Sequence, residues 1–360
     1  MTNMKTKLSL LCLPLVAALS WCSVAYGAEF AITPLRLSPR VAVFYGDPWD
    51  NGIVAIATPK GMVVVDAPFS QTISQGFREA IQVEFKRNDF AYLINTHEHV
   101  CHVGGNAAYA DIPIVGHESL RREMLKAGTD PQRVPDMLAL SDQQIGAARE
   151  YFRKKDPKKL EDGSFAGIEK CWKIIQADYR GNPPVVPPTI TFDREMTLHL
   201  GDVTVRLMYY GCAHGVADTV ISIPEENLVL TGGVFYPTHV PIAGPATEEA
   251  TPEIVDHWFV VMHGVLNDAN ENTRFLPSHG RAIMKKEQYV QFVSYLEKLW
   301  EGVRRAQAAG KTLEQTKAEL PLTNFPEVAK LPNEELRGTQ WEILDIHQQN
   351  IDHLWKVLGK

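Results

Sequence analysis

The chain has 360 residues, of which 45% are hydrophobic and 22% charged, enough for one large domain with appendages or for two modest ones. Its formal net charge is -7, and a net acidic chain is a poor match for nucleic acid or an anionic membrane surface, because both bind clustered Lys and Arg. We therefore expect a small-molecule substrate and no nucleic-acid partner.

Residues 1–27 have the layout of an export signal. In chain order this layout consists of Lys5 and Lys7, an apolar run from Leu8 to about Leu19, and small residues around Ala25 and Gly27. The apolar run is shorter than the roughly 20 residues needed to cross a bilayer, so an uncleaved membrane anchor is the less favoured alternative. We expect cleavage near Gly27, a periplasmic or secreted protein, no stable membrane insertion, and a formal net charge of -9 after cleavage.

Short β-rich runs separated by turns come next and predict a mixed or antiparallel sheet. They are Val41 to Tyr45, Ile53 to Ala57 and Met62 to Val65. Phe77, Ile81 and Phe85 then recur at helical spacing. A further strand, Ala91 to Ile94, leads into Thr96-His97-Glu98-His99-Val100-Cys101-His102, so a cluster of reactive side chains follows directly after a strand.

This cluster offers four candidate metal ligands within six residues: His97, His99, Cys101 and His102. Imidazole and thiolate are the ligands that zinc prefers. In an extended loop, His97 and His99 can point to the same side, while Cys101 and His102 turn toward a neighbouring point. We expect one metal to be bound by the first pair and a second by the other pair.

From about residue 118 to 187 the composition becomes charged and helix-prone, which predicts a helical insertion that helps to shape a substrate cleft. A solvated helical appendage is the alternative. Strand patterns then return, at Thr189 to Phe192, Met196 to Leu200, Val203 to Tyr209, Thr219 to Ile223 and Leu228 to Leu230.

After Pro277-Ser278-His279-Gly280 the sequence is predicted to be helical to its end. The segment from Asn333 carries Leu336, Leu344, Ile351, Leu354, Trp355 and Leu358 at amphipathic spacing. We expect this segment to pack on the parent domain, with a homodimer contact as the alternative. The predicted organisation is a catalytic domain over residues 28–300 that includes the helical insertion, followed by a C-terminal helical extension over residues 301–360.

The cluster resembles the His-x-His-x-Asp-His signature of the metallo-β-lactamase superfamily, with Cys101 in place of Asp. Three other segments resemble that family in order and spacing. They are Val63 to Asp66, which ends in the family's buried Asp, Gly211 to Thr219, which carries a third histidine, and Pro277 to Gly280, which carries the last ligand. The resemblance covers most of the mature chain and implies an α/β fold, the metallo-β-lactamase αββα sandwich.

The resemblance also implies roles for individual residues. His97, His99 and His214 would bind one zinc, and Cys101, His102 and His279 would bind a second, whose occupancy the sequence leaves open. Asp66 and Thr96 would orient ligand imidazoles through the nitrogen that does not face the metal, and we expect Asp218 to act in the same way. An ordinary turn or cap carboxylate is the alternative for Asp66 and Asp218.

Two positions depart from the family pattern. Gly233 stands where many members have an Asp that bridges two metals, which disfavours the thioesterase, lactonase and phosphodiesterase branches. Cys101 can bind a metal as thiolate, but it replaces an Asp that also orients the attacking hydroxide. A disulfide between Cys101 and Cys212 is a further alternative.

We therefore expect a secreted zinc-dependent hydrolase that attacks a small molecule with a zinc-bound hydroxide. The favoured substrate is a β-lactam or a related amide or ester. One alternative is a hydrolase with an unusual leaving group, such as a dehalogenase or a sulfatase-like enzyme. Others are an iron-dependent oxidoreductase on the same fold and a metal- or ligand-binding protein without catalysis.

Overall fold

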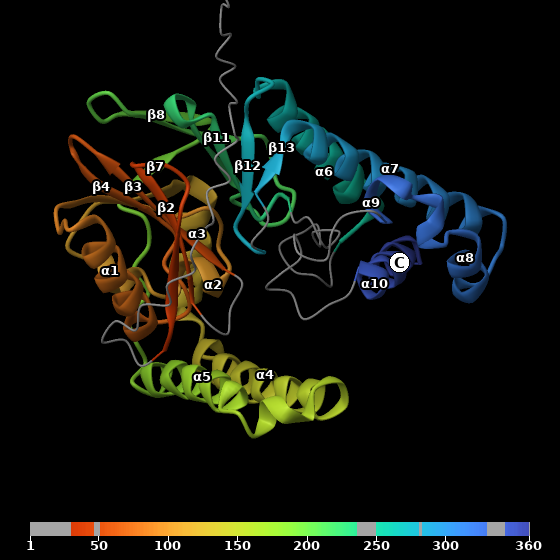
Figure 1. Cartoon of the computed structure of the whole chain (residues 1–360), viewed down its shortest axis with the longest axis horizontal. Helices are drawn as coiled ribbons and strands as arrows, with labels where there is room; N and C mark the ends of the chain where they lie inside the picture. The colour runs from red at the N-terminus through yellow and green to blue at the C-terminus, as the bar shows by residue number, and fades with distance from the viewer. Residues whose placement is uncertain (1–29, 47–50, 236–249, 281–282, 330–342, 360) are drawn as a thin grey trace, which may run out of the picture.

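Two β-sheets packed face to face form the centre of the molecule, and helices cover both outer sides (Figure 1). The computed structural model describes residues 30–46, 51–235, 250–280, 283–329 and 343–359. The expected αββα sandwich is confirmed. The expected export signal, residues 1–27, lies outside the described residues.

The first sheet contains seven strands that lie side by side in sequence order. They are β1 (Ile32–Arg36), β2 (Val41–Gly46), β3 (Gly52–Thr58), β4 (Gly61–Val65), β5 (Phe90–Ile94), β6 (Ile114–His117) and β7 (Ile190–Phe192). Neighbours are antiparallel from β1 to β4 and parallel from β4 to β7. The change follows from the connections, because short turns join β1 to β4, whereas the helix α1 (Gln71–Phe85) crosses over between β4 and β5.

The second sheet has six strands in the spatial order β13-β12-β11-β10-β9-β8. They are β8 (Glu195–His199), β9 (Thr204–Tyr209), β10 (Thr219–Ile223), β11 (Leu228–Gly232), β12 (Arg274–Pro277) and β13 (Met284–Lys285). Only β11 and β12 pair in parallel, and the helix α6 (Pro252–Asn267) lies between them in the chain. The sequence patterns predict β2 to β5 and β7 to β11 but no element at β1, β6, β12 or α6. The expectation of helix directly after Gly280 is wrong at β13, which pairs with β12 as an edge strand.

Three apolar layers hold the sandwich together. Between the sheets, residues such as Val63 and Ile94 of the first sheet meet Leu207 and Ile221 of the second. The other two layers lie between the first sheet and α1, and between the second sheet and α6 with the C-terminal helices. A fully buried side chain of this size stabilises the folded state by about 1.5–3 kcal/mol, so the layers fix the strand ends on which the polar side chains lie.

The expected insertion is helical, as predicted. It consists of α3 (Glu118–Thr129), α4 (Arg133–Lys155), a 3-10 turn at Pro157–Leu160 and α5 (Ser164–Arg180). Helices α4 and α5 form an antiparallel pair that projects from the sandwich beneath the first sheet (Figure 1). The indole of Trp172 on α5 packs edge-on against Phe69, with ring centroids 5.4 Å apart, which joins the pair to the loop after β4.

The C-terminal helices cover the outer side of the second sheet. They are α7 (Lys286–Ala308), α8 (Leu313–Glu319), α9 (Pro326–Ala329) and α10 (Ile343–Leu358). Helix α7 runs without interruption across residues 300 and 301, where the sequence analysis places the start of the extension. Ile351 and Leu354 of α10 are buried in the same core as α7, in agreement with packing on the parent domain. No helix in the described ranges is both long and apolar enough to span a membrane.

Candidate metal centre

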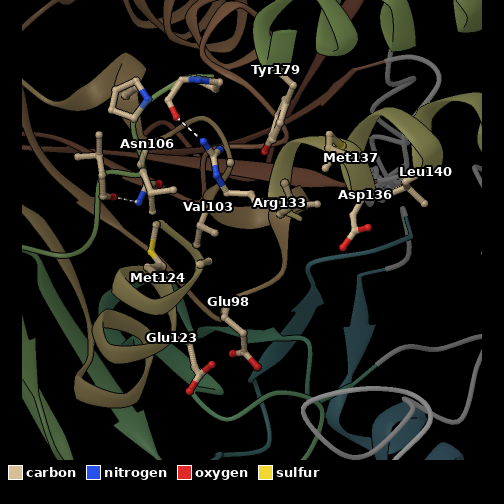
Figure 2. Close-up of a pocket in the computed structure, with 18 residues that line it drawn as sticks. Glu98, Val103, Asn106, Glu123, Met124, Arg133, Asp136, Met137, Leu140 and Tyr179 are labelled. Carbon is tan, nitrogen blue, oxygen red and sulfur yellow. Dashed lines mark hydrogen bonds between the residues drawn. The ribbon is translucent and has the colours of Figure 1, made fainter. Parts of the chain in front are cut away.

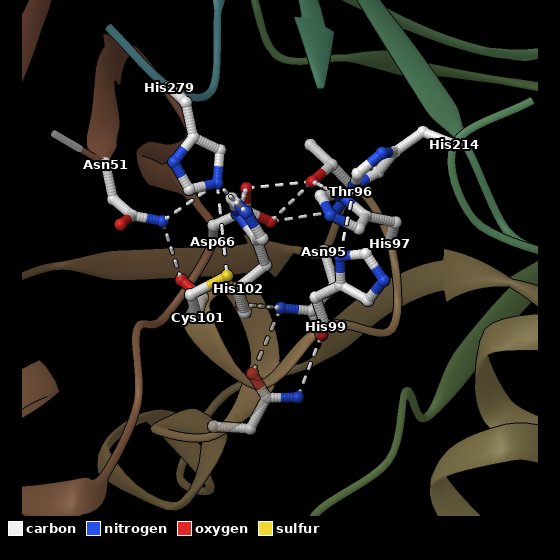
Figure 3. Close-up of polar contacts among 11 residues, drawn as sticks. Asn51, Asp66, Asn95, Thr96, His97, His99, Cys101, His102, His214 and His279 are labelled. Carbon is white, nitrogen blue, oxygen red and sulfur yellow. Dashed lines mark hydrogen bonds and ion pairs between the residues drawn. The ribbon is translucent and has the colours of Figure 1, made fainter. Parts of the chain in front are cut away.

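Six candidate metal ligands from three separate segments of the chain meet at one edge of the sandwich (Figure 3). His97 and His99 lie in the loop after β5, and Cys101 and His102 lie on the short helix α2 (Val100–Val103) that follows. The cluster is therefore not wholly extended, as the sequence analysis assumed, because a helical turn carries its second half. His214 comes from the loop before β10, and His279 follows β12.

The six side chains form two groups of three. The first ligand set is His97, His99 and His214, and the second ligand set is Cys101, His102 and His279. Within each set the ligand atoms lie within 4.8 Å of one another. The sets are adjacent, since the rings of His97 and His102 have centroids 4.1 Å apart. This grouping is the one that the family resemblance implies.

Hydrogen bonds fix which nitrogen of His97 is free for a metal. Thr96 Oγ1 lies 2.8 Å from Asp66 Oδ2 and 3.0 Å from His97 Nδ1. A carboxylate only accepts, so Thr96 donates its one proton to Asp66 and accepts from His97 Nδ1. The lone pair of a neutral His97 is then on Nε2, which is buried and has no hydrogen-bond partner among the described residues.

The same carboxylate orients His102 in the second ligand set. His102 Nδ1 donates to Asp66 Oδ2 at 2.8 Å, so Nε2 of a neutral His102 also carries a lone pair. That nitrogen lies 3.0 Å from His279 Nε2, and Cys101 Sγ lies 3.9 Å from the same His279 atom. Asp66 therefore supports one ligand of each set, as the sequence analysis expected.

Burial and neighbouring charges set the protonation of the ligands. Burial, together with the surrounding imidazoles, holds the pKa of His97 well below its usual value, so this ring is neutral and able to bind a metal. Burial alone would raise the pKa of the Cys101 thiol, but His102 and His279 lower it well below its usual value. Burial opposes the charged form of His102, but the Cys101 thiolate and Asp66 raise the pKa of His102 to about 10, so the two side chains form a thiolate–imidazolium pair. A metal bound to both would take the place of the proton on His102 Nε2.

The donor set fits zinc. His99 Nδ1 and His214 Nε2 lie 3.0 Å apart, as do the paired nitrogens of the second ligand set, and a cation between such nitrogens satisfies both lone pairs. Three imidazoles in one set, and two imidazoles with one thiolate in the other, are donors that zinc prefers. A zinc ion held by three such ligands would have a fourth coordination position open, as catalytic zinc sites do.

Asp218 acts on the backbone and not on an imidazole. Its Oδ2 accepts hydrogen bonds from the N–H groups of Ala213, His214 and Gly215 at 2.9, 2.6 and 2.9 Å. The expectation that Asp218 orients a ligand ring is therefore wrong. Burial and the nearby Glu98 carboxylate raise the pKa of Asp218 to about 7, while the three N–H groups oppose this shift. Asp218 holds the loop that presents His214.

Gly233 lies directly against the His214 ring. A Cβ atom at position 233 would lie 2.2 Å from His214 Cδ2, closer than any van der Waals contact allows. The position where many family members have a bridging Asp therefore has no room for a side chain while His214 keeps this orientation. Cys101 and Cys212 are both free thiols, so the alternative of a disulfide between them is wrong.

Several polar side chains that support the ligand loops were not predicted from the sequence. Asn51 Nδ2 donates to the Cys101 carbonyl at 3.2 Å and lies 3.5 Å from His279 Nε2. Asn95 donates to the His102 carbonyl at 3.3 Å, and its amide pairs with that of Asn106. Glu98 accepts from the Val216 N–H at 2.8 Å. Of these, only Glu98 could have been suspected, because it lies inside the histidine cluster.

The glycine pair after the cluster allows close packing. A Cβ on Gly104 would lie 2.2 Å from the Phe69 carbonyl oxygen. A Cβ on Gly105 would lie 1.8 Å from Ser74 Oγ. Gly104 thus lets the end of α2 approach the loop after β4, which carries Asp66, and Gly105 lets it approach the start of α1.

Comparisons with known proteins agree with this geometry. A family model described as "Metallo-beta-lactamase superfamily" matches residues 48–274. A search of curated proteins finds no match. Among solved structures, the sec-alkylsulfatase Pisa1 from Pseudomonas sp. is 12% identical with a TM-score of 0.57, and the match covers 89% of this chain and 49% of that one. The chain thus spans about half the length of the alkylsulfatase.

Two smaller structures align over less of this chain but over nearly all of their own length. A metallo-beta-lactamase from Pontibacter korlensis is 13% identical, with a TM-score of 0.48 and coverage of 73% of this chain and 97% of its own. The protein TMB-1 is 14% identical, with a TM-score of 0.49 and coverage of 74% and 97%. The family model spans more than half of the sequence. The chain belongs to the metallo-β-lactamase superfamily.

Proposed function

We propose that this protein is a zinc-dependent hydrolase of a small molecule and that it acts after export from the cytoplasm. The observation that carries the proposal is the pair of adjacent three-residue ligand sets, with His97 and His102 both oriented by Asp66. Export is supported by the signal-like residues 1–27 alone.

Some residues of the site would bind the metal, and others hold the metal-binding side chains in position. When bound by three neutral histidines, a zinc ion would lower the pKa of a coordinated water molecule to about 7. His97, His99 and His214 provide those imidazoles, while Asp218 and Glu98 hold the loop of His214 through backbone N–H groups. The Cys101 thiolate adds charge to the second ligand set but accepts hydrogen bonds weakly, so it cannot orient a water molecule as a carboxylate does.

For the substrate we propose a β-lactam or a related cyclic amide or ester, because hydrolysis of such bonds needs only an activated water and a cation near the carbonyl oxygen. A second candidate is a sulfate ester. The fold match to the sec-alkylsulfatase favours it, because that match extends over 89% of this chain, beyond the range of the family model. Fold likeness does not transfer an activity, so substrate assays must separate the two candidates.

The proposal is tested by assaying a chromogenic β-lactam, a lactone and an alkyl sulfate with the same purified protein. We expect hydrolysis of at least one of them, loss of that activity after chelation, and recovery with added zinc. The variant His97→Ala should fall to the level of buffer, whereas His263→Ala, which removes an exposed imidazole on α6, should match the wild type. Protein that binds iron and not zinc, or zinc protein inactive on all three substrates, would refute the proposal.

A second prediction concerns Cys101. If its thiolate binds a metal, the wild type should contain two zinc ions per chain and Cys101→Ser about one, because a neutral hydroxyl is a much weaker ligand than a thiolate. Metal content measured by plasma mass spectrometry after dialysis decides this. Cys171→Ser is the matched control, since Cys171 is a buried cysteine on α5 that belongs to neither ligand set. Unchanged zinc content in Cys101→Ser would remove Cys101 from the metal site.

A further inference from the structure

A cavity of about 430 Å³ lies between the metal-binding loop and the helical insertion (Figure 2). One wall comes from Glu98, Val100 and Val103, which alternate along the chain with ligand residues. The opposite walls come from α3, α4 and α5. His99 lies between two of these wall residues in the sequence, so the cavity and the first ligand set share one stretch of backbone. None of the six ligand side chains lines the cavity itself.

The surface of the cavity is mainly apolar. Met124 of α3, Met137 and Leu140 of α4, and Val103 of α2 all line it, and Met124 and Met137 are less than a tenth exposed. Pockets of this volume with apolar walls and few polar groups are typical of small-molecule sites. Methionine side chains adapt to ligands of different shape, which suits a flexible hydrocarbon group.

The charges at the cavity exclude an anion as its occupant. Three carboxylates, those of Glu98, Glu123 and Asp136, lie along it, against a single cation, Arg133. The Arg133 guanidinium donates to Asn182 Oδ1 at 2.7 Å and to the Pro183 carbonyl at 2.8 Å, which fixes it to the wall. An anionic group would meet net negative charge here, whereas an uncharged hydrocarbon group would not.

Glu98 connects the wall of the cavity to the loop that carries His214. Figure 2 shows the carboxylates of Glu98 and Glu123 at one end of the cavity and Tyr179 at the other. Glu98 Oε1 accepts from the Val216 N–H in the His214 loop, and its Oε2 is buried without a hydrogen-bond partner among the described residues. With one oxygen bonded to Val216 and the other buried, Glu98 closes this end of the cavity, and a hydrocarbon group would extend from it toward Tyr179.

We propose that this cavity is a subsite for an uncharged hydrocarbon group of the substrate, whose reacting bond lies beyond Glu98 at the metal centre. The identification of this group as part of the substrate rests on the proposed hydrolase function. The binding of a hydrocarbon group in the cavity can be tested without that function. The helical insertion then selects substrates by the length of their apolar part, a role that the ligand sets cannot perform.

Binding is tested directly with a series of 1-alkanols, from butanol to decanol, by isothermal titration calorimetry on the metal-loaded protein. Each added methylene should tighten binding about fourfold until the chain fills the cavity, which corresponds to ~0.8 kcal/mol per buried CH₂. The variant Met124→Trp should weaken octanol binding at least tenfold by filling the cavity. Leu125→Trp is the matched control, because Leu125 is the next residue of α3 and is 50% exposed.

A second variant tests the cavity independently, in case Met124→Trp does not fold. Ala127 lines the cavity from an exposed position on α3, so Ala127→Trp adds bulk at the cavity without replacing a core residue. It should also weaken octanol binding. Alkanol affinity that does not rise with chain length would overturn the proposal, and so would octanol binding by both cavity variants that equals that of Leu125→Trp.

Catalysis gives an independent measurement. With p-nitrophenyl esters from acetate to octanoate, kcat/KM of the wild type and of Leu125→Trp should rise with acyl length, whereas in Met124→Trp the ratio of kcat/KM for octanoate to kcat/KM for acetate should fall toward one. Length-dependent alkanol binding without hydrolysis of any ester or other substrate would mean that the proposed function fails and the cavity binds a ligand of another kind. Ester hydrolysis with no length dependence, in protein that binds no alkanol, would overturn the subsite alone.

Discussion

Replacing Gly233 with aspartate, which would restore the family's bridging acid, is expected to abolish zinc binding by the first ligand set and hydrolysis with it. The Cβ of the new residue would lie 2.2 Å from His214 Cδ2 and 3.0 Å from His214 Nε2, the atom that faces His99. His214 cannot keep its orientation at these distances. Metal content should fall by about one zinc per chain, and activity should fall as in His97→Ala.

Two further variants separate the clash from the added charge. Gly233→Ala introduces the same Cβ without a carboxylate, so it should lose zinc from the first ligand set as well. Gly167→Asp, on α5, adds an acid where a Cβ has no neighbour within 4 Å, and it should bind zinc like the wild type. If Gly233→Asp kept two zinc ions and full activity, the His214 ring would have room to move and our account of this glycine would be wrong.

The sequence predicted most of the ligands because they follow a local pattern. Four of the six occur between His97 and His102, and the resemblance to a known family supplied His214 and His279. The structure brings all six together at one edge of the sandwich. Periodicity also located the strands that carry them, since β4 and β5 are short, continuous apolar runs that end at turns.

Other features depend on contacts between distant residues and leave no local signal. Asn51 meets the carbonyl of Cys101, 50 residues away, and no pattern around Asn51 indicates this. Asp218 reaches three backbone N–H groups because the His214 loop folds over it, which its spacing from His214 does not reveal. Helix α6 buries Val255, Trp258 and Met262 on one face but leaves the apolar Val260 exposed, so its apolar residues do not mark one face clearly in the sequence.

Asp66 is the residue whose loss should damage both ligand sets at once. It accepts from Thr96 N and Thr96 Oγ1, and through that hydroxyl it orients His97, while it accepts directly from His102 Nδ1. Only 1% of Asp66 is exposed, so its removal leaves several buried donors unpaired, at a cost of about 1–3 kcal/mol each. Loss of such an orienting partner typically lowers metal affinity or activity 10–100-fold. We expect Asp66→Ala to reduce both zinc affinities and the free energy of unfolding.

Asp66→Asn distinguishes the charge from the shape of this side chain. Asp66 has φ 69°, a left-handed conformation that asparagine tolerates better than alanine, so the backbone should be preserved. If the side-chain amide of the new asparagine accepts from Thr96 N–H through its oxygen, its NH₂ group faces His102 Nδ1. The NH₂ group and the His102 Nδ1–H are both donors, so the hydrogen bond to His102 is lost. The denaturant concentration at which Asp66→Asn unfolds should therefore be closer to the wild-type value than that of Asp66→Ala. Its zinc affinity at the second ligand set should nevertheless be as low as that of Asp66→Ala. If Asp66→Asn matched the wild type in zinc affinity at both sets, orientation of His102 by the carboxylate would be excluded as a requirement for metal binding.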